Sequence, residues 1–230
     1  MYNNKKFLAV VPARGGSKGI PRKNIYAVQD KPLIAYSIEE AKKSRYIDRV
    51  IVSTDDLEIA EVSIECGAEV PFLRPTELAT DDAKIIDVLL HLINTVQENY
   101  DYVVTLQPTQ PLRVASHIDR SIERLFEKEY SDLVSLSPIS EHPILIRSID
   151  ENGNLHSLLN QDSTVRRQNF APYYYVNGAI YINKVSELDK YTSLNDNKGY
   201  YVIKENLIDI DDFDDINWLE KFLEKNEMEQ

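Results

Sequence analysis

The chain has 230 residues, which is enough for one domain with a substantial core, and its apolar (43%) and charged (28%) fractions are ordinary for a globular protein. Its formal net charge of −12 argues against nucleic acid and an anionic membrane as partners, because both bind basic surfaces. The sequence contains no run of about 18 apolar residues, which excludes a membrane-spanning helix. The single cysteine, Cys66, has no partner for an internal disulfide, and we expect a cytoplasmic protein.

Short apolar runs alternate with amphipathic stretches from the N-terminus to Leu136. The apolar runs predict strands, and the stretches with apolar residues at helical spacing predict helices. We expect strands at 7–11, 49–53, 68–73, 102–106 and 133–136. We expect helices at 31–43 and 82–96, a helix that begins at Asp55 and Glu58 with a capping-box-like start, and a helix that begins at Ser116. Such alternation is typical of an α/β fold in which helices cover both faces of a mostly parallel, twisted sheet.

The rhythm changes in the second half of the chain. Residues 147–149 and 155–159 flank an Asn-Gly pair, which predicts a hairpin with a tight turn. We therefore expect one domain over 1–230, with a protruding arm at 138–175 that makes dimer contacts and contributes to the site. Strands are expected again at 177–183 and 207–210. The final helix, 214–225, is expected to bury Trp218, Leu219 and Phe222.

Three polar loops follow strands of the predicted sheet: 14–24, 54–56 and 107–113. Ligands of open α/β sheets bind in the crevice beyond the carboxyl ends of the strands. We therefore expect the three loops to converge on one site.

The first of these loops is basic in an acidic protein. Arg14, Lys18, Arg22 and Lys23 lie within ten residues, beside the Gly15-Gly16 pair. Glycines let backbone N–H groups approach an anion, and lysine and arginine supply charge for phosphate oxygens. The spacing fits neither the Walker loop nor the dinucleotide-binding fingerprint. The loop indicates triphosphate binding, and the alternative is a solvated basic turn.

A pair of carboxylates occurs near the other end of the chain. Asp209 and Asp211 are two residues apart on the predicted strand, so their side chains share one face. Magnesium typically binds one or two carboxylates together with phosphates and water, and we predict Mg²⁺ at this pair. The alternative is a solvated acidic segment, which we assign to the acidic residues at the start of the final helix, Asp212, Asp214 and Asp215.

Several segments together resemble one enzyme family. In chain order they are the loop Pro12–Asn24, Ser53-Thr-Asp55, Leu73-Arg-Pro75 with Leu78–Asp81, Leu106–Arg113, Arg167-Gln168, Asn177–Ile182 and Ile208–Asp211. Their wording and order resemble the N-acylneuraminate cytidylyltransferases, also called CMP-sialic acid synthetases, along nearly the whole chain. A single motif of this kind is weak, but seven in the expected order are strong.

The resemblance implies a Rossmann-like nucleotidyltransferase that moves CMP from CTP to the anomeric hydroxyl of a nonulosonic acid and acts as a homodimer. It implies catalytic roles for Arg14, Lys23 and Asp211, and a metal at Asp209 and Asp211. It implies that CTP is bound by Arg14, Gly15, Gly16, Ser17, Lys18, Lys23, Asn24, Arg74, Thr80 and Asp81. It implies that the sugar is bound by Gln107, Asn177, Tyr181 and Arg167. Whether Arg167 acts in its own chain or across a dimer interface is left open. The acceptor of the sugar's hydroxyl proton is left open between Asp211 and a group on the metal.

Two departures from the family fall on the sugar side. Tyr175 and Leu145 stand where well-known bacterial members have an arginine and a lysine, and Gln110 stands where a serine is common. The sugar is therefore left open among neuraminic, legionaminic and pseudaminic acids. Two further alternatives are a related nucleotidyltransferase that acts on octulosonic acid or a sugar 1-phosphate, and a non-catalytic nucleotide-binding regulator.

Overall fold

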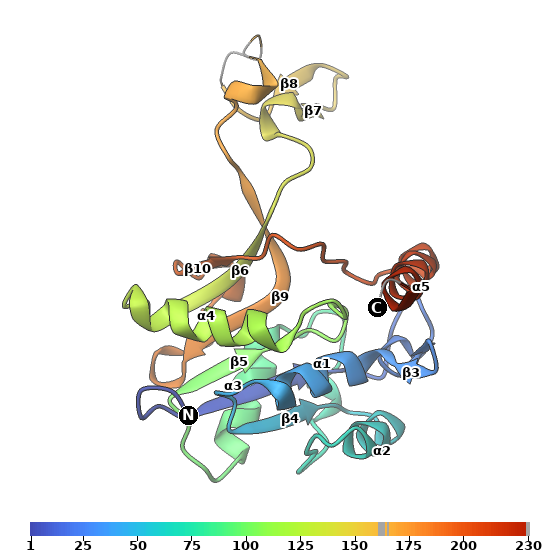
Figure 1. The fold of residues 1–230 in the computed structure, drawn as a ribbon, viewed down its shortest axis with the longest axis vertical. Helices are drawn as coiled ribbons and strands as arrows, with labels where there is room; N and C mark the ends of the chain where they lie inside the picture. The colour runs from blue at the N-terminus through green and yellow to red at the C-terminus, as the bar shows by residue number, and fades with distance from the viewer. Residues whose placement is uncertain (161–163, 165, 229–230) are drawn as a thin grey trace.

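The structure, a computed structural model, describes residues 1–160, 164 and 166–228 (Figure 1). Its main sheet has six strands in the order β10-β6-β9-β5-β1-β4. These strands are β1 (Phe7–Pro12), β4 (Arg49–Ser53), β5 (Tyr102–Thr105), β6 (Asp132–Pro138), β9 (Tyr174–Lys184) and β10 (Tyr200–Val202). The pairs β1–β4, β1–β5 and β10–β6 are parallel, whereas β9 runs antiparallel to both of its neighbours. The predicted mostly parallel sheet is confirmed.

Helices cover both faces of this sheet. The helices α1 (Leu33–Lys43), α2 (Leu57–Glu65) and α4 (Ala115–Glu127) pack on one face, and α3 (Ile85–Thr95) packs on the other. Successive side chains of a strand point to opposite faces. Accordingly, Ala9 and Val11 of β1 join the cluster under α1 and α4, while Leu8 and Val10 join the cluster under α3. Within the part of the chain that the structure describes, no helix combines the length and apolar character needed to cross a membrane.

A smaller apolar cluster joins the two ends of the chain. The last helix, α5 (Phe213–Met228), packs through Leu219 near the small hairpin β2 (Ala27–Val28) and β3 (Lys31–Pro32). Ile20 and Ile210 are fully buried in this cluster. Because Ile20 precedes Lys23 and Ile210 precedes Asp211, the cluster brings the basic loop to the acidic segment.

The segment between β6 and β9 rises away from the sheet as an arm (Figure 1). Near its far end, β7 (Arg147–Ile149) pairs antiparallel with β8 (Leu155–Ser157), as the predicted hairpin requires. The short helices η3 (Pro143–Leu145) and η4 (Arg167–Asn169) lie in the same segment. Ile149 and Leu155 of the hairpin are 71% and 69% exposed.

Two predicted strands are wrong. Residues 68–73 make only an isolated bridge, between Glu69 and Ile51, and Pro71 cannot donate a further ladder hydrogen bond. Residues 207–210 form no strand, although Ile210 N–H donates to the Thr109 carbonyl at 2.9 Å. The strand of this region is β10, which lies earlier in the chain and was not predicted.

Two helix details also differ from the prediction. The N-cap of α2 is Asp56, whose side chain accepts from the Ile59 N–H at 3.0 Å, rather than Asp55. In α5, Leu219 is buried as expected, but Trp218 is 42% exposed and stacks on Phe222. The apolar stripe of α5 therefore faces the core through Ile216 and Leu219.

Candidate active site

A cleft of about 440 Å³ lies beyond the carboxyl ends of β1 and β5. Two of the three predicted loops, 14–24 and 107–113, line it directly. All of the predicted CTP-binding residues except Gly15 and Gly16 are in its wall, together with Gln107 and Asp211. The full lining is Pro12, Arg14, Ser17, Lys18, Gly19, Lys23, Asn24, Arg74, Leu78, Thr80, Asp81, Ala83, Ile85, Val88, Gln107, Pro108, Thr109 and Asp211.

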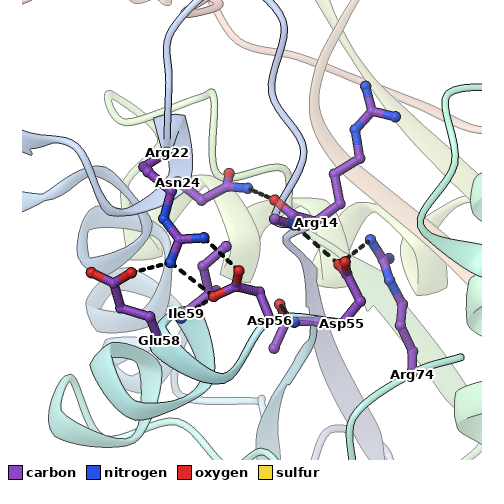
Figure 2. Close-up of polar contacts among 10 residues, drawn as sticks. Arg14, Arg22, Asn24, Asp55, Asp56, Glu58, Ile59 and Arg74 are labelled. Carbon is purple, nitrogen blue, oxygen red and sulfur yellow. Dashed lines mark hydrogen bonds and ion pairs between the residues drawn. The ribbon is translucent and has the colours of Figure 1, made fainter. Parts of the chain in front are cut away.

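The third loop holds the basic loop from below (Figure 2). Asp55 accepts a hydrogen bond from the Gly15 N–H at 3.0 Å, and Asn24 Nδ2 donates to the Arg14 carbonyl at 2.9 Å. A Cβ on Gly15 would lie 2.8 Å from an Asp56 carboxylate oxygen, so only glycine fits this turn without a shift. The glycine turn is therefore held by the protein itself. Sequence reasoning placed Asp55 in a motif and at the start of a helix, but assigned it no role in holding the basic loop.

Arg22 does not belong to the cleft. Its guanidinium pairs with the carboxylates of Asp56 and Glu58, on the side of α2 (Figure 2). The hydrogen bond to Arg22 lowers the pKa of Asp56, and the same bond raises the pKa of Arg22. Of the four clustered cations, only Arg14, Lys18 and Lys23 line the cleft.

Lys23 and Asp211 meet at one wall of the cleft, although they are far apart in sequence. Lys23 Nζ donates to the Ile210 carbonyl at 2.7 Å and lies 3.2 Å from Asp211 Oδ1. Gly19 is in close contact here, because a Cβ at this position would lie 2.3 Å from the Asp211 carbonyl oxygen. The structure thus brings a cation and a carboxylate to one point of the cleft, and their catalytic roles stay predictions.

Asp81 reaches the other two cations. Its carboxylate lies 2.8 Å from Arg14 Nη1 and 2.7 Å from Lys18 Nζ. Hydrogen bonding to Lys18, and then to Arg14, lowers the pKa of Asp81. One carboxylate therefore engages the two cations that the sequence assigned to phosphate oxygens. An anionic ligand would meet these cations already paired.

Arg74 forms a buried cationic wall. Its side chain is 4% exposed, its Nη2 is 3.7 Å from Asp55 Oδ1, and its Nε has no hydrogen-bond partner among the described residues. Desolvation lowers the pKa of Arg74, while the Asp55 carboxylate opposes this shift. A buried donor without a partner is costly, so this guanidinium suits a ligand that supplies acceptors.

Asp209 and Asp211 were expected to share one face of a strand, but residues 207–210 form no strand and only Asp211 of the two lines the cleft. Burial raises the pKa of Asp209, a hydrogen bond from Thr109 lowers it, and the charge of Asp211 raises it. Asp211 is 79% exposed, and the described residues contain no group of three or more His, Cys, Asp or Glu that could enclose an ion. Magnesium needs only one or two carboxylates when phosphates and water complete its shell. Asp211 therefore lies where an ion could be held jointly with a phosphate ligand, and a metal contact of Asp209 stays a prediction.

A second pocket, of about 520 Å³, adjoins the cleft. Gln107 and Ile85 line both, and Tyr181 lies in the second, with its hydroxyl donating to Asn195 Oδ1 at 2.8 Å. Asn177 is buried beneath this region, and its side chain bonds to Ser135 and Ser137. Hence two of the four predicted sugar residues, Gln107 and Tyr181, line one pocket, while Asn177 as a direct contact stays a prediction.

Arg167, the fourth predicted sugar-binding residue, lies in the arm. Its backbone belongs to η4 in the arm, and its side chain is outside the part of the chain that the structure describes. Its predicted contact with the sugar therefore stays a prediction.

Known proteins share both the sequence and the fold of this chain. It is 39% identical over 200 residues to the CMP-N,N'-diacetyllegionaminic acid synthase of Legionella pneumophila. The aligned part covers 85% of this chain and 83% of that protein. It is 35% identical to the N-acylneuraminate cytidylyltransferase of Streptococcus agalactiae over 91% of this chain, but only 51% of that enzyme's length is matched.

The fold also matches a solved structure. The structure of CMP:2-keto-3-deoxy-manno-octonic acid synthetase complexed with CTP superimposes with a TM-score of 0.75 and covers 96% of this chain and 99% of that chain, at 17% identity. At this identity the likeness concerns the fold alone. The sequence model described as Cytidylyltransferase matches residues 8–227. Because that match spans almost the whole chain, the protein belongs to the cytidylyltransferase family.

Proposed function

We propose that this protein transfers CMP from CTP to the anomeric hydroxyl of a nonulosonic, sialic-type acid and releases pyrophosphate. The observation that carries the proposal is the approach of Lys23 to Asp211 within a cleft that Arg14 and Arg74 also line. Two sequence relatives are named for coupling CMP to acids of this class, legionaminic and neuraminic.

The cleft suits a triphosphate. Arg14 and Lys18 can bind phosphate oxygens when their ion pairs with Asp81 break. Lys23 lies where its positive charge can oppose the negative charge on the attacked phosphate. Arg74 offers its Nε, which has no hydrogen-bond partner among the described residues, to the remaining part of the nucleotide. An in-line displacement is accelerated mainly by alignment and by fixed opposing charge, and these residues supply both.

A divalent metal, which we infer to be Mg²⁺, would be held by Asp211 and Asp209 together with phosphate oxygens. When bound, it supplies positive charge to the phosphates. Asp211 is also this chain's own candidate acceptor for the proton of the attacking hydroxyl, since it lies beside Lys23 at the cleft wall.

The adjoining pocket suits the sugar. Gln107 joins the two cavities, and the second offers the phenol of Tyr181, the amide of Asn195 and the ammonium of Lys190. A carboxylated, polyhydroxylated acid presents groups that match such donors and acceptors. Its position beside the cleft would bring the anomeric hydroxyl toward the nucleotide.

We also infer a homodimer formed through the arm. Exposed apolar residues cluster on the arm, where Ile149, Leu155 and Leu158 are all exposed. A contiguous apolar surface of this kind usually marks a protein interface. Arg167 in the same arm would then reach the sugar pocket of the partner. A cytoplasmic location is consistent with CTP as donor and with an unpaired Cys66.

The proposal is tested by pyrophosphate release. Purified protein is incubated with Mg²⁺, one of the four nucleoside triphosphates, and neuraminic, legionaminic, pseudaminic or octulosonic acid, and each arm is repeated with EDTA. We expect release only with CTP, only with metal, and fastest with one of the three nonulosonic acids. Fastest release with octulosonic acid, or with a sugar 1-phosphate added as a further arm, would favour the related nucleotidyltransferase. Binding of CTP without turnover of any sugar would favour a regulator.

A further inference from the structure

A fully buried arginine lies just behind the sugar side of the cleft. Arg113 ends the loop that follows β5, and its side chain has no solvent exposure. Its Nη1 donates to two carbonyls, that of Gln107 at 3.2 Å and that of Ala179 in β9 at 2.9 Å. Its Nε and Nη2 have no hydrogen-bond partner among the described residues. The guanidinium therefore joins the loop to the neighbouring strand.

The carbonyl of Gln107 is held from three directions. Besides Arg113 Nη1, it accepts from Ser37 Oγ at 3.2 Å and from the Gln110 N–H at 3.3 Å. Ser37 is in α1, so a helix, the loop itself and a buried cation all fix one peptide group. This peptide carries the side chain that lines both cavities.

A second tie connects the same loop to β9. Gln110 Nε2 donates to the Asn177 carbonyl at 2.7 Å, and Gln110 is 2% exposed. Between the two ties, Gly178 has a positive φ of 75°, and a Cβ there would lie 3.0 Å from Gln107 Oε1. The carboxamide of Gln107 is thus fitted against a strand position that has no side chain.

Stability alone does not explain this arrangement. Desolvation lowers the pKa of Arg113 to about 9, against the raising effect of Glu40, so the guanidinium stays charged near neutral pH. Burying a charge is costly, and packed apolar residues of similar volume are often at least as stabilising. What an apolar residue cannot do is hold two carbonyls at a fixed separation.

We propose that Arg113, assisted by Gln110, is a positioning residue that fixes the Gln107 carboxamide for the sugar substrate. This inference rests on the proposed function. Arg113 itself lines neither cavity, so it acts through Gln107 and not on the substrate. The nucleotide cations are anchored by other contacts, and their geometry does not depend on this tie.

The test separates positioning from stability. The variants are Arg113→Met and Gln110→Met, with Ile122→Val as a control that loosens the buried face of α4 without touching the loop. For each, the Tm, the Kd for CTP by calorimetry, and kcat and KM for the sugar are measured. We expect the two loop variants to bind CTP within about twofold of the unmodified protein, while kcat/KM for the sugar falls roughly 10- to 100-fold, as displacement of a reacting group by about 1 Å produces. The control should lower Tm and leave kcat/KM unchanged.

A conservative replacement adds a third readout. Arg113→Lys restores a donor to one carbonyl but cannot hold both as a fork does. We expect its sugar kcat/KM to lie between those of Arg113→Met and the unmodified protein. If Arg113→Met does not fold, Gln110→Met decides the outcome alone.

Two results would overturn the inference. Unchanged sugar kinetics in the folded loop variants would show that the ties do not position Gln107, and equal losses of CTP affinity and sugar turnover would show a general structural defect. If the unmodified protein releases no pyrophosphate with any sugar, the proposed function fails and this inference fails with it. Unchanged sugar kinetics in the variants would remove this inference alone.

Discussion

The cleft and the arm are built in opposite ways. In the cleft, two of the cations already have carboxylate partners within the molecule: Lys23 with Asp211, and Arg14 with Asp81. In the arm, the hairpin leaves Ile149 and Leu155 largely exposed to solvent. A preformed polar cleft is typical of a ligand site, whereas an apolar surface of this kind is typical of a protein interface. Together with the proposed homodimer, this contrast predicts that one chain completes the nucleotide side and that the arm of a second chain contributes to the sugar side.

The largest effect is expected for Lys23→Ala. Lys23 is only 16% exposed, and it is the cation beside Asp211, so its loss removes fixed charge from the attacked phosphate. Removing one such group typically lowers kcat by about a hundredfold or more, and we expect this for pyrophosphate release. The matched control is Lys5→Ala, which removes a lysine paired with Asp101, a residue that does not line the cleft. Turnover near the unmodified rate in Lys23→Ala would remove this residue from the mechanism.

The next effect tests the arm. The double substitution Ile149→Lys with Leu155→Lys places two like charges on the exposed apolar face of the hairpin. If this face is an interface, the variant should elute as a monomer, at half the mass of the unmodified dimer, because burying unpaired charge is unfavourable. We expect sugar turnover to fall roughly tenfold or more, which corresponds to a loss of about 1.4 kcal/mol. The Kd for CTP should stay within about twofold of the value for the unmodified protein.

The outcome of the arm variant decides the comparison. A monomer with full sugar turnover would show that one chain completes both sides of the site. An unchanged dimer would place the interface elsewhere. A suitable control is Glu151→Lys at the exposed turn of the same hairpin, which adds positive charge without changing the apolar face.

A moderate effect on stability is expected for Gly19→Ala. The added Cβ would lie 2.3 Å from the Asp211 carbonyl oxygen, so the basic loop or the acidic segment must shift. Overpacking of this kind typically costs about 1–3 kcal/mol of unfolding free energy. Gly16→Ala is the matched control, since nothing lies within 4 Å of a Cβ there. Denaturant unfolding should show the loss only for Gly19→Ala, and equal stabilities would show that the contact is not tight in solution.

Much of the fold could be predicted from the sequence. The runs at 7–11, 49–53 and 102–106 became strands because they are mostly apolar and are buried on both faces. The prediction failed where tertiary contacts decide. Tyr200–Val202 is only three residues long and exposed at its start, yet it pairs with β6. The more apolar 207–210 forms no ladder and is held instead by separate contacts to Thr109 and Lys23.

The site was predictable in outline and not in its connections. The loops at the strand ends converge as parallel-sheet topology requires. The departure of Arg22 toward Asp56, and the capture of Arg14 and Lys18 by Asp81, depend on where side chains point across the loop. The roles of Gly19 and Arg113 depend on distances between segments far apart in the chain, which spacing in one sequence does not encode.

The smallest effect is expected at Asp56, which pairs with Arg22 outside the cleft. Asp56 caps α2 and holds Arg22, so Asp56→Ala should lower the unfolding free energy by about 1 kcal/mol, the usual value of an N-cap. Arg22 lowers the pKa of Asp56 below its ordinary value of 3.8. A depressed folded-state pKa stabilises the protein above the unfolded pKa, and this contribution is lost as pH falls through the folded value. Urea unfolding at pH 7 and near pH 3 should therefore show a difference from the unmodified protein that shrinks in acid.

Asp56→Asn is the matched control, because asparagine still caps the helix but cannot pair with a guanidinium. We expect it to keep more of the stability at pH 7 than Asp56→Ala does, because the cap remains. Its difference from the unmodified protein should shrink in acid just as that of Asp56→Ala does, because both variants remove the same titrating carboxyl. Neither variant should change the Kd for CTP by more than about twofold, since Arg22 lies outside the cleft lining. A large rise in CTP affinity would show that the released Arg22 turns into the cleft. Asp56, and not the course of the loop, would then be what keeps Arg22 away from the ligand.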